Sequence, residues 1–196
     1  MVIFYRLDTK LYVNITNDCP CACTFCIRQQ TDSVGDAKSL WLEREPTIQE
    51  IKTAFDNRKD LKEVDEIVFC GYGEPMERAD DVIEVARYIK EKIQVPVRIN
   101  TNGLVQLINP DFDISKLAVI DTVSVSLNAD DAEEYNRNTR PRFGIVSYDT
   151  LLEFARTAKT YTSVAFSVMD VLGEKRIENC RTIARDMSIP LRVRQS

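Results

Sequence analysis

The segment Leu11–Cys26, LYVNITNDCPCACTFC, joins a strand pattern directly to a loop with four cysteines. Its first six residues alternate apolar and polar side chains, which predicts a strand over Leu11–Thr16 with one apolar face. The cysteine loop follows at the carboxyl end of that strand, where barrels and open α/β sheets carry their sites. This order of elements predicts a strand that leads the chain into a site.

The same order recurs along the chain, because short strand patterns alternate with helix-length amphipathic patterns. The other strands are expected at Glu66–Gly71, Val97–Asn102, Thr122–Asn128, Ser163–Asp170 and Leu191–Arg194. A capping box over Thr47–Glu50 predicts the start of one helix. Two apolar stripes predict further helices, namely Val82, Ala86, Ile89 and Ile93, and Ile177, Cys180, Ala184 and Met187.

Six alternations of strand and helix predict an α/β fold with a parallel sheet and right-handed crossovers. A complete eight-unit barrel typically needs about 250 residues, and this chain has 196. We therefore expect a single-domain, TIM-like partial (βα)6 barrel over residues 1–196, without an auxiliary-cluster or capping domain.

The expected strands alternate in polarity, with apolar odd-numbered and polar even-numbered positions, as in Val97–Asn102 and Thr122–Asn128. Parallel strands that are covered on both faces carry nearly continuous apolar runs instead. If the odd-numbered residues pack on the helices, the even-numbered ones line a polar concave face, which predicts a ligand cavity. A half-solvated sheet would show the same alternation and is the alternative.

Composition bounds the class of protein. The net charge of −5 argues against non-specific nucleic-acid binding. The absence of histidine excludes Ser-His-Asp and Cys-His catalysis and histidine-ligated zinc. No run approaches the ~20 apolar residues of a membrane span, and no secretory signal is visible. We expect a cytoplasmic protein whose cysteines are thiols or metal ligands, with Cys70 and Cys180 as core thiols.

Cys19, Cys23 and Cys26 have the spacing Cys-x-x-x-Cys-x-x-Cys. Three thiolates hold three irons of a [4Fe–4S] cluster, whose full set of ligands would be four cysteines. The fourth iron is then open, which is a catalytic arrangement, so we expect an enzyme. Three alternatives stay open: a four-cysteine zinc site that includes Cys21, a redox dithiol over Cys23–Cys26, and buried thiols that bind nothing.

Loops after the next strands carry further candidate residues. Gly71–Pro75, GYGEP, offers close backbone approach to a ligand and, in Glu74, a carboxylate that accepts from an ammonium group. Asn100–Gly103, NTNG, offers amides after the third strand. The fourth and fifth strands end in the polar residues Ser126, Asn128 and Asp170. Each is also compatible with an ordinary turn or strand end, and their common position at strand carboxyl ends favours a site.

Together these motifs resemble the core of radical S-adenosylmethionine (SAM) enzymes, where a three-cysteine loop, a Gly-Glu-Pro turn, a Thr-Asn-Gly segment and a Ser-x-Ser-x-Asn strand occur in this order. The resemblance covers roughly residues 11–194. Within that superfamily the chain is similar to the TatD-associated radical SAM proteins. The stretches that carry this similarity are Leu40–Pro46 (LWLEREP), Phe69–Pro75 (FCGYGEP), Arg98–Gly103 (RINTNG) and Arg140–Gly144 (RPRFG).

The resemblance implies a [4Fe–4S] cluster on Cys19, Cys23 and Cys26, with the amino and carboxylate groups of SAM on the fourth iron. The implied SAM contacts are Phe25 along the adenine, Gly73 and Glu74 at the methionine ammonium, Ser126 and Asn128 at the ribose or carboxylate, Asn102 in support, and the backbone near Asp170 beside the adenine. Tyr72 stands where the family's usual Gly-Gly-Glu-Pro has its first glycine, which leaves the contact at position 72 open.

The reaction that the resemblance implies is reductive cleavage of SAM to a 5′-deoxyadenosyl radical, which then takes hydrogen from a substrate. An external donor such as flavodoxin or ferredoxin would supply the electron. The protein is expected to be oxygen-sensitive, and a homodimer would close the wide mouth of a short barrel. No residue is assigned to proton transfer.

Five arginines bear on the class of substrate, which the motifs above do not assign. Arg98, Arg192 and Arg194 on the inferred concave face, with Arg140 and Arg142 in a loop, suit an anionic small molecule. Surface salt bridges explain the same arginines equally well. An activase or modifying enzyme acting on a protein, peptide or nucleic acid is the alternative function. A non-catalytic zinc or iron–sulfur module that binds a partner is a third hypothesis.

Overall fold

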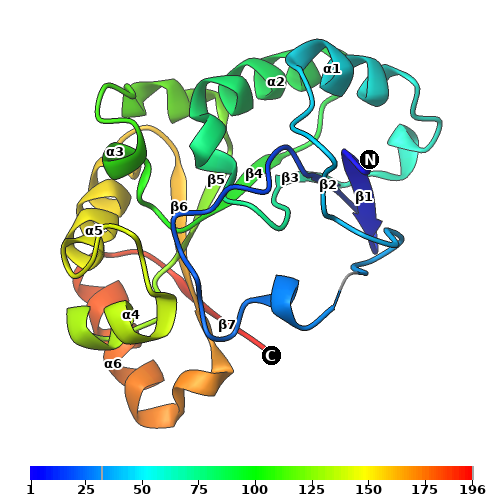
Figure 1. The fold of residues 1–196 in the computed structure, drawn as a ribbon. Coiled ribbons are helices and arrows are strands. Elements are labelled where there is room, and N and C mark those ends of the chain that lie inside the picture. Colours follow the sequence, from blue (N-terminus) through cyan, green and yellow to red (C-terminus); the bar gives the residue numbers. More distant parts are fainter. Residues whose placement is uncertain (32, 196) are drawn as a thin grey trace.

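The strands form one seven-stranded sheet in the computed structural model, which describes residues 1–31 and 33–195. Their order in the sheet follows the order of the chain (Figure 1). The strands are β1 Phe4–Leu7, β2 Lys10–Val13, β3 Glu66–Phe69, β4 Val97–Thr101, β5 Thr122–Ser126, β6 Ser163–Met169 and β7 Leu191–Arg194. Strands β2 to β7 all pair in parallel, which confirms the predicted α/β partial barrel.

The N-terminal strand β1 is an element that the sequence patterns did not predict. It pairs antiparallel with β2, with Tyr5 opposite Tyr12, and these two rings stack with centroids 5.0 Å apart. A tight turn joins the two strands, and Asp8 in it has a left-handed φ of 56°. The parallel sheet therefore carries one antiparallel edge strand, as many mixed sheets do.

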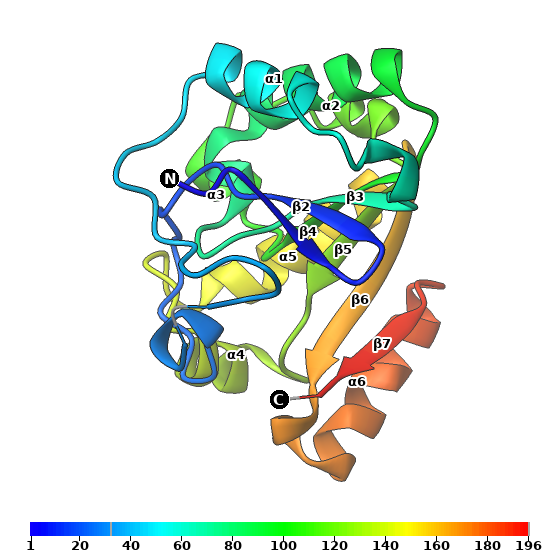
Figure 2. The same cartoon turned by 90° about the vertical axis from the view of Figure 1, so that its right-hand side faces the viewer.

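The longer helices α1, α2, α5 and α6 lie along one face of the sheet (Figures 1 and 2). The helices are α1 Ile48–Asp56, α2 Ala79–Lys92, α3 Val105–Ile108, α4 Ala132–Thr139, α5 Val146–Ala158 and α6 Glu174–Asp186. The predicted capping box opens α1, because Thr47 and Glu50 each accept the other's backbone N–H. On α2 the predicted stripe is buried at Val82, Ala86 and Ile89. Within the described part of the chain, none of the helices combines the length and apolar content of a membrane span.

Strand register sorts the side chains onto two faces. Apolar residues pair with apolar residues in one row, as Ile99 does with Phe69. Polar residues share the other row, as Asn100 does with Ser124. The apolar row is buried in the core beneath the helices. The second row forms the polar concave face that the alternation predicts.

The strands that lead into site loops end earlier than the sequence patterns predict. Strand β2 stops at Val13 rather than three residues later. The next residue, Asn14, uses its Nδ2 to donate to the carbonyl oxygens of Val2 at 3.1 Å and Leu40 at 2.8 Å. At the end of β2 the Asn14 side chain thus begins to hold neighbouring segments, which apolar alternation alone does not reveal.

Candidate active site

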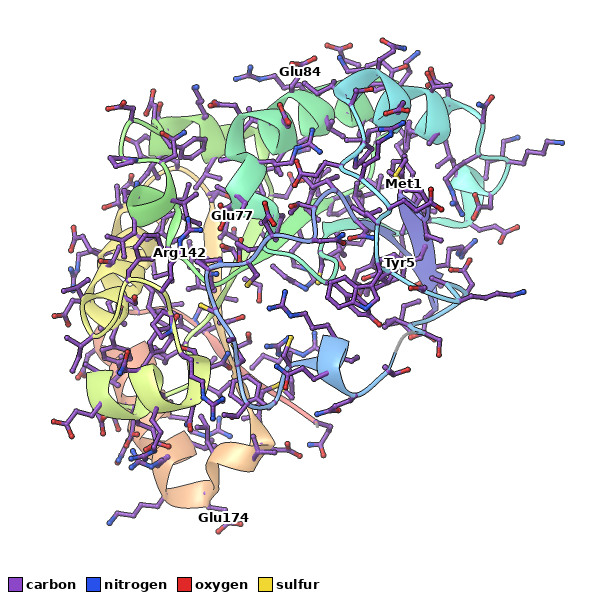
Figure 3. All side chains as sticks on the ribbon, in the orientation of Figure 1. Met1, Tyr5, Glu77, Glu84, Arg142 and Glu174 are labelled. Atoms are coloured by element: carbon purple, nitrogen blue, oxygen red, sulfur yellow. The ribbon has the colours of Figure 1, made fainter. Side chains whose placement is uncertain are left out.

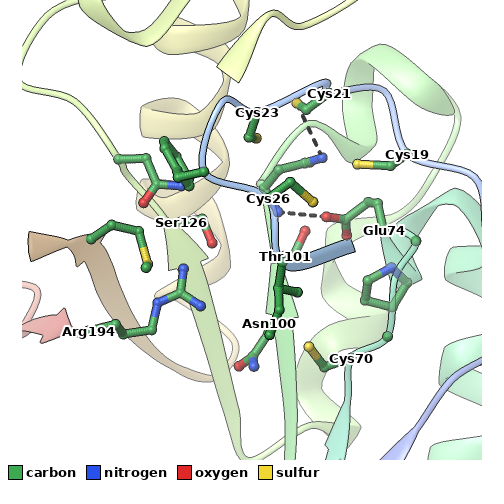
Figure 4. A pocket seen from close by; sticks show the side chains of 18 of the residues that line it. Cys19, Cys21, Cys23, Cys26, Cys70, Glu74, Asn100, Thr101, Ser126 and Arg194 are labelled. Atoms are coloured by element: carbon green, nitrogen blue, oxygen red, sulfur yellow. Dashed lines mark hydrogen bonds between the residues drawn. The ribbon is translucent and has the colours of Figure 1, made fainter. Parts of the chain in front are cut away.

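A cavity of about 330 Å³ lies at the carboxyl ends of the parallel strands (Figure 4). Its volume falls in the range of small-molecule pockets, roughly 300–1,000 Å³. The predicted site residues that line it are Cys19, Cys23, Phe25, Cys26, Gly73, Glu74, Asn102, Ser126 and Asn128. Asp170 is not among the lining residues, but its neighbour Met169 is. The fold therefore brings residues from four separate loops to one place.

The cysteine loop is held in shape by the backbone of the segment after α4. The Ala22 N–H donates to the carbonyl oxygen of Thr139 at 2.9 Å. Cys21 forms an isolated antiparallel bridge with Pro141. These main-chain bonds hold the loop without using its thiols.

The thiols of Cys19, Cys23 and Cys26 share the cavity and are each half-buried. Among residues 1–31 and 33–195, no three metal-ligating side chains already lie close enough together to hold a metal ion. The donor set nevertheless fits an iron–sulfur cluster in its chemistry, because soft thiolates from one loop are the ligands that such clusters use. The three cysteines are therefore candidate ligands by kind and by shared location.

Cys21 is the fourth cysteine of this loop and is buried. Its sulfur accepts a weak hydrogen bond from the side-chain amide of Asn102, with Nδ2 and Sγ 3.8 Å apart. Cys21 lines the same cavity as the other three.

Glu74 lies in the turn after β3, with only 5% of its surface exposed. Its Oε2 accepts the Asn102 backbone N–H at 2.7 Å, and its Oε1 accepts the Met76 N–H at 3.0 Å. Burial raises the pKa of Glu74 to about 7. Within the described residues no lysine or arginine pairs with it, so this carboxylate is suited to bind a cationic group of a ligand.

Gly73 lets the Glu74 turn pack against the chain that leads to the cysteines. Its N–H donates to the Thr16 carbonyl oxygen at 3.1 Å, and the Glu74 N–H donates to the Asp18 carbonyl oxygen at 2.7 Å. A Cβ at position 73 would lie 2.3 Å from the Thr16 oxygen and 2.7 Å from the Asp18 oxygen. The sequence predicts that the glycines of this turn allow close approach to a ligand. In the structure Gly73 allows close approach to the backbone of Thr16 and Asp18, in the chain that leads to the cysteines.

Tyr72, the departure from the family's usual glycine, is not among the residues that line the cavity. It is buried in a small cluster with Tyr5 and Leu40. Its hydroxyl donates to the Thr31 carbonyl oxygen, and its ring meets Trp41 edge-on with centroids 5.1 Å apart. The bulky side chain at this position therefore packs beside the cavity and leaves the cavity open.

Asn128 supplies a buried polar atom that lacks a partner. It follows β5 with a left-handed φ of 51°, a conformation that asparagine adopts more readily than most residues. Its Oδ1 is buried and has no hydrogen-bond partner among the described residues. A buried acceptor without a donor costs about 1–3 kcal/mol, and a ligand hydroxyl or amine would remove that cost. Ser126 lines the same cavity two residues earlier.

Several lining residues were not among the sequence predictions, namely Ile27, Tyr135, Met169 and Gln195. Alternation along β6 places Met169 on the same face as Ser167, so this residue could have been found from the pattern. Tyr135 is a buried residue of α4, and its sequence context resembles that of any core residue on a helix.

The two cysteines outside the loop differ in their outcome. Cys180 is fully buried on α6, as predicted. The core assignment of Cys70 is wrong, because Cys70 lines the cavity directly after β3. The physical reason is its even-numbered position, which places its side chain in the polar concave row with Asn100.

Comparison with known proteins agrees with the site. Residues 13–186 match the family described as the radical SAM superfamily. No curated protein sequence matches the chain significantly. A solved structure described as "Native anSMEcpe with bound AdoMet" superimposes with a TM-score of 0.62 at 16% identity, over 94% of this chain and 50% of that chain. This likeness shows the fold, and the chain spans about half the length of that structure. Since the family match covers most of the sequence, the chain belongs to the radical SAM superfamily and is an enzyme of that class.

Proposed function

We propose that this enzyme binds a [4Fe–4S] cluster through Cys19, Cys23 and Cys26 and binds SAM in the adjoining cavity. The observation that carries the proposal is the convergence of three unlike groups on one cavity: the thiols, the unpaired Glu74 carboxylate and the orphaned Oδ1 of Asn128. The thiols are ligands for a cluster, and the Glu74 carboxylate suits the ammonium group of an amino acid. The Oδ1 of Asn128 suits a ribose hydroxyl or an amine.

When bound, the cluster would supply one electron for the reductive cleavage of SAM and so enable the abstraction of hydrogen from a substrate held in the cavity. The protein residues position the reactants and exclude water. Glu74 orients the methionine end through charge and geometry, since both of its oxygens are already fixed by backbone N–H groups. Phe25 offers an apolar surface to the adenine, and Ser126 and Asn128 offer polar atoms.

The narrower similarity to the TatD-associated radical SAM proteins rests on four sequence stretches. One of them, Arg140–Gly144, has a structural role beside the cysteine loop. Arg140 ends α4 in a left-handed conformation, Pro141 bridges Cys21, and the Arg142 N–H donates to the Pro20 carbonyl oxygen at 2.8 Å. The stretch is therefore part of the support of the cysteine loop.

The test of the proposed function is SAM cleavage by the reconstituted protein. We expect anaerobic reconstitution with iron and sulfide to give a brown protein with four irons per chain. Addition of SAM and dithionite should then yield 5′-deoxyadenosine, measured by liquid chromatography. A protein with an intact cluster that forms none would refute the proposal.

The same preparation tests the competing hypothesis of a non-catalytic zinc module. One zinc per chain and a colourless protein would favour that hypothesis. The Cys180→Ala variant is the matched control, because Cys180 is buried in the core far from the loop in sequence. It should keep the iron content of the wild type, so that loss of iron in loop variants reports on the loop.

A further inference from the structure

Arg194 is a half-buried cation at the cavity. It is the last residue of β7, opposite Met169 in the strand register, and its side chain lines the cavity with Cys70 and Asn100 (Figure 4). Its Nε atom is buried and has no hydrogen-bond partner in the described part of the chain. No carboxylate of the described residues forms an ion pair with it.

The other arginines that were expected on the concave face differ from Arg194. Arg98 is held by Glu66, with Nε and Oε1 2.8 Å apart, and also donates to Asn100. Arg192 is exposed and does not line the cavity. The salt-bridge explanation thus holds for Arg98, and Arg194 is left as the cavity's uncompensated arginine.

A half-buried cation without an ion-pair partner is unfavourable, and two neighbouring arginines make it more so. Burial lowers the pKa of Arg194 most, the positive charges of Arg192 and Arg98 lower it further, and Cys70 and Cys23 act in the opposite direction. A guanidinium nevertheless stays protonated in proteins. Burial also raises the pKa of the Cys70 thiol, which keeps that neighbour neutral. Removing such a cation from water is repaid when an anion pairs with it.

Two anions other than a substrate could pair with Arg194: the SAM carboxylate and the cluster with its thiolate ligands. The carboxylate and ammonium of an amino acid share one carbon, so both would lie near Glu74. Figure 4 shows Glu74 and Arg194 entering the cavity from opposite sides. The cysteine loop lies above the strand ends (Figure 4), and its Cys23 acts on the pKa of Arg194 more weakly than Cys70 does.

We propose that Arg194 binds an anionic group of the substrate, a carboxylate or a phosphate, within the cavity. The planar guanidinium offers paired donors that match either group. This inference rests on the proposed function, because it assigns the substrate class for the same site. It places the substrate's charge on the β7 side of the cavity and leaves the Glu74 side to SAM.

The test uses the reconstituted enzyme loaded with SAM and titrates it with inorganic phosphate and, separately, acetate at constant ionic strength. Isothermal titration calorimetry reports the affinity of each anion. The variants are Arg194→Gln, Arg194→Lys and the matched control Arg192→Gln, which removes the same charge two residues away on the same strand. Iron content and circular dichroism show that each variant is loaded and folded.

We expect at least one anion to bind the wild type and the Arg192→Gln variant equally. The Arg194→Gln variant should bind it at least about tenfold more weakly, as loss of a charge-assisted hydrogen bond implies, and Arg194→Lys should recover part of the loss. SAM affinity should not change. A preference for phosphate or for acetate would identify which group the substrate carries.

Three results would overturn the inference: no binding of either anion to the wild type, an equal loss in Arg192→Gln, or weakened SAM or cluster binding in Arg194→Gln. The last would assign Arg194 to the cofactors. Failure of the proposed function looks different, because the wild type would then form no 5′-deoxyadenosine, whatever its affinity for phosphate.

Discussion

Replacing Glu74 by glutamine removes one charge from the site and little volume. In the proposed complex the carboxylate binds the SAM ammonium, and both of its oxygens are already oriented by N–H groups of Asn102 and Met76. Hydrogen bonds to charged groups contribute about 1.5–3 kcal/mol. Since 1.4 kcal/mol is tenfold in affinity, the Kd for SAM should rise by roughly 10- to 150-fold.

The pH dependence gives a second, independent signature. Burial raises the pKa of Glu74 to about 7, above the ordinary carboxyl value of 4.5. Below pH 7 the free protein therefore holds a proton that the SAM ammonium must displace. The wild-type Kd should rise by up to about tenfold for each pH unit below 7, whereas the glutamine variant should show no such acid limb. Above pH 8 both should weaken, because α-amino groups lose their proton near about 7.7–8.0.

The assay is anaerobic calorimetric titration of the reconstituted protein with SAM between pH 5.5 and 8.5. Glu77→Gln is the matched control: Glu77 lies three residues further on and pairs with Arg142 at 3.5 Å (Figure 3), and it does not line the cavity. The charge of Glu77 contributes to the raised pKa of Glu74, so this control should keep the wild-type Kd above pH 7 and retain an acid limb that begins at a lower pH. Thermal unfolding is measured in parallel, because the glutamine amide would face one of the two N–H donors. An unchanged Kd, or an acid limb that persists without Glu74, would contradict the assignment of Glu74 to the SAM ammonium.

Three further predictions concern the frame of the site. Gly73→Ala forces a Cβ to within 2.3 Å of the Thr16 carbonyl oxygen, so calorimetry should show a loss of ~1–3 kcal/mol, or about 2–12 °C in Tm; an unchanged Tm would contradict the packing. Burial opposes ionisation of Glu66, but hydrogen bonds from Arg98 and Lys10 hold the Glu66 pKa below 4.5. Glu66→Gln should therefore destabilise the protein in urea at pH 7, and its difference from wild type should shrink as the pH falls below about 4.5; a constant difference would contradict this sign. Cys21→Ala should keep four irons per chain, because three cysteines suffice for the proposed site; loss of iron would make Cys21 a ligand.

The fold was largely predictable because most of its strands can be recognised from local alternation of apolar and polar residues. Alternation in Val97–Asn102 and Thr122–Asn128 indicated both the strands and their polar face, and the register then aligned that face across the sheet. Strand β1 was not predicted because its four residues are too few to show a clear alternation. Its position depends on pairing with β2 and on the stack of Tyr5 on Tyr12, which are contacts between segments.

The residues that line the site were predictable in part, but the contacts that hold its loops in place were not. Motif spacing named the three cysteines and Glu74, whereas the hydrogen bond from Ala22 to the Thr139 carbonyl oxygen uses backbone atoms that any residues would supply. The absence of an ion-pair partner for Arg194 among the described residues could not be predicted either. It depends on Glu66 pairing with Arg98, which the sequence does not show. Such facts are set by which charges meet in space.

In the proposed site three cysteines leave one iron of the cluster for SAM. Mössbauer spectroscopy of protein reconstituted with ⁵⁷Fe, recorded with and without SAM, is the decisive test. We expect one iron in four to change its isomer shift when SAM is added, and Cys21→Ala to give the same pair of spectra. A full cluster whose four irons are unaffected by SAM, or whose spectrum changes when Cys21 is replaced, would contradict it.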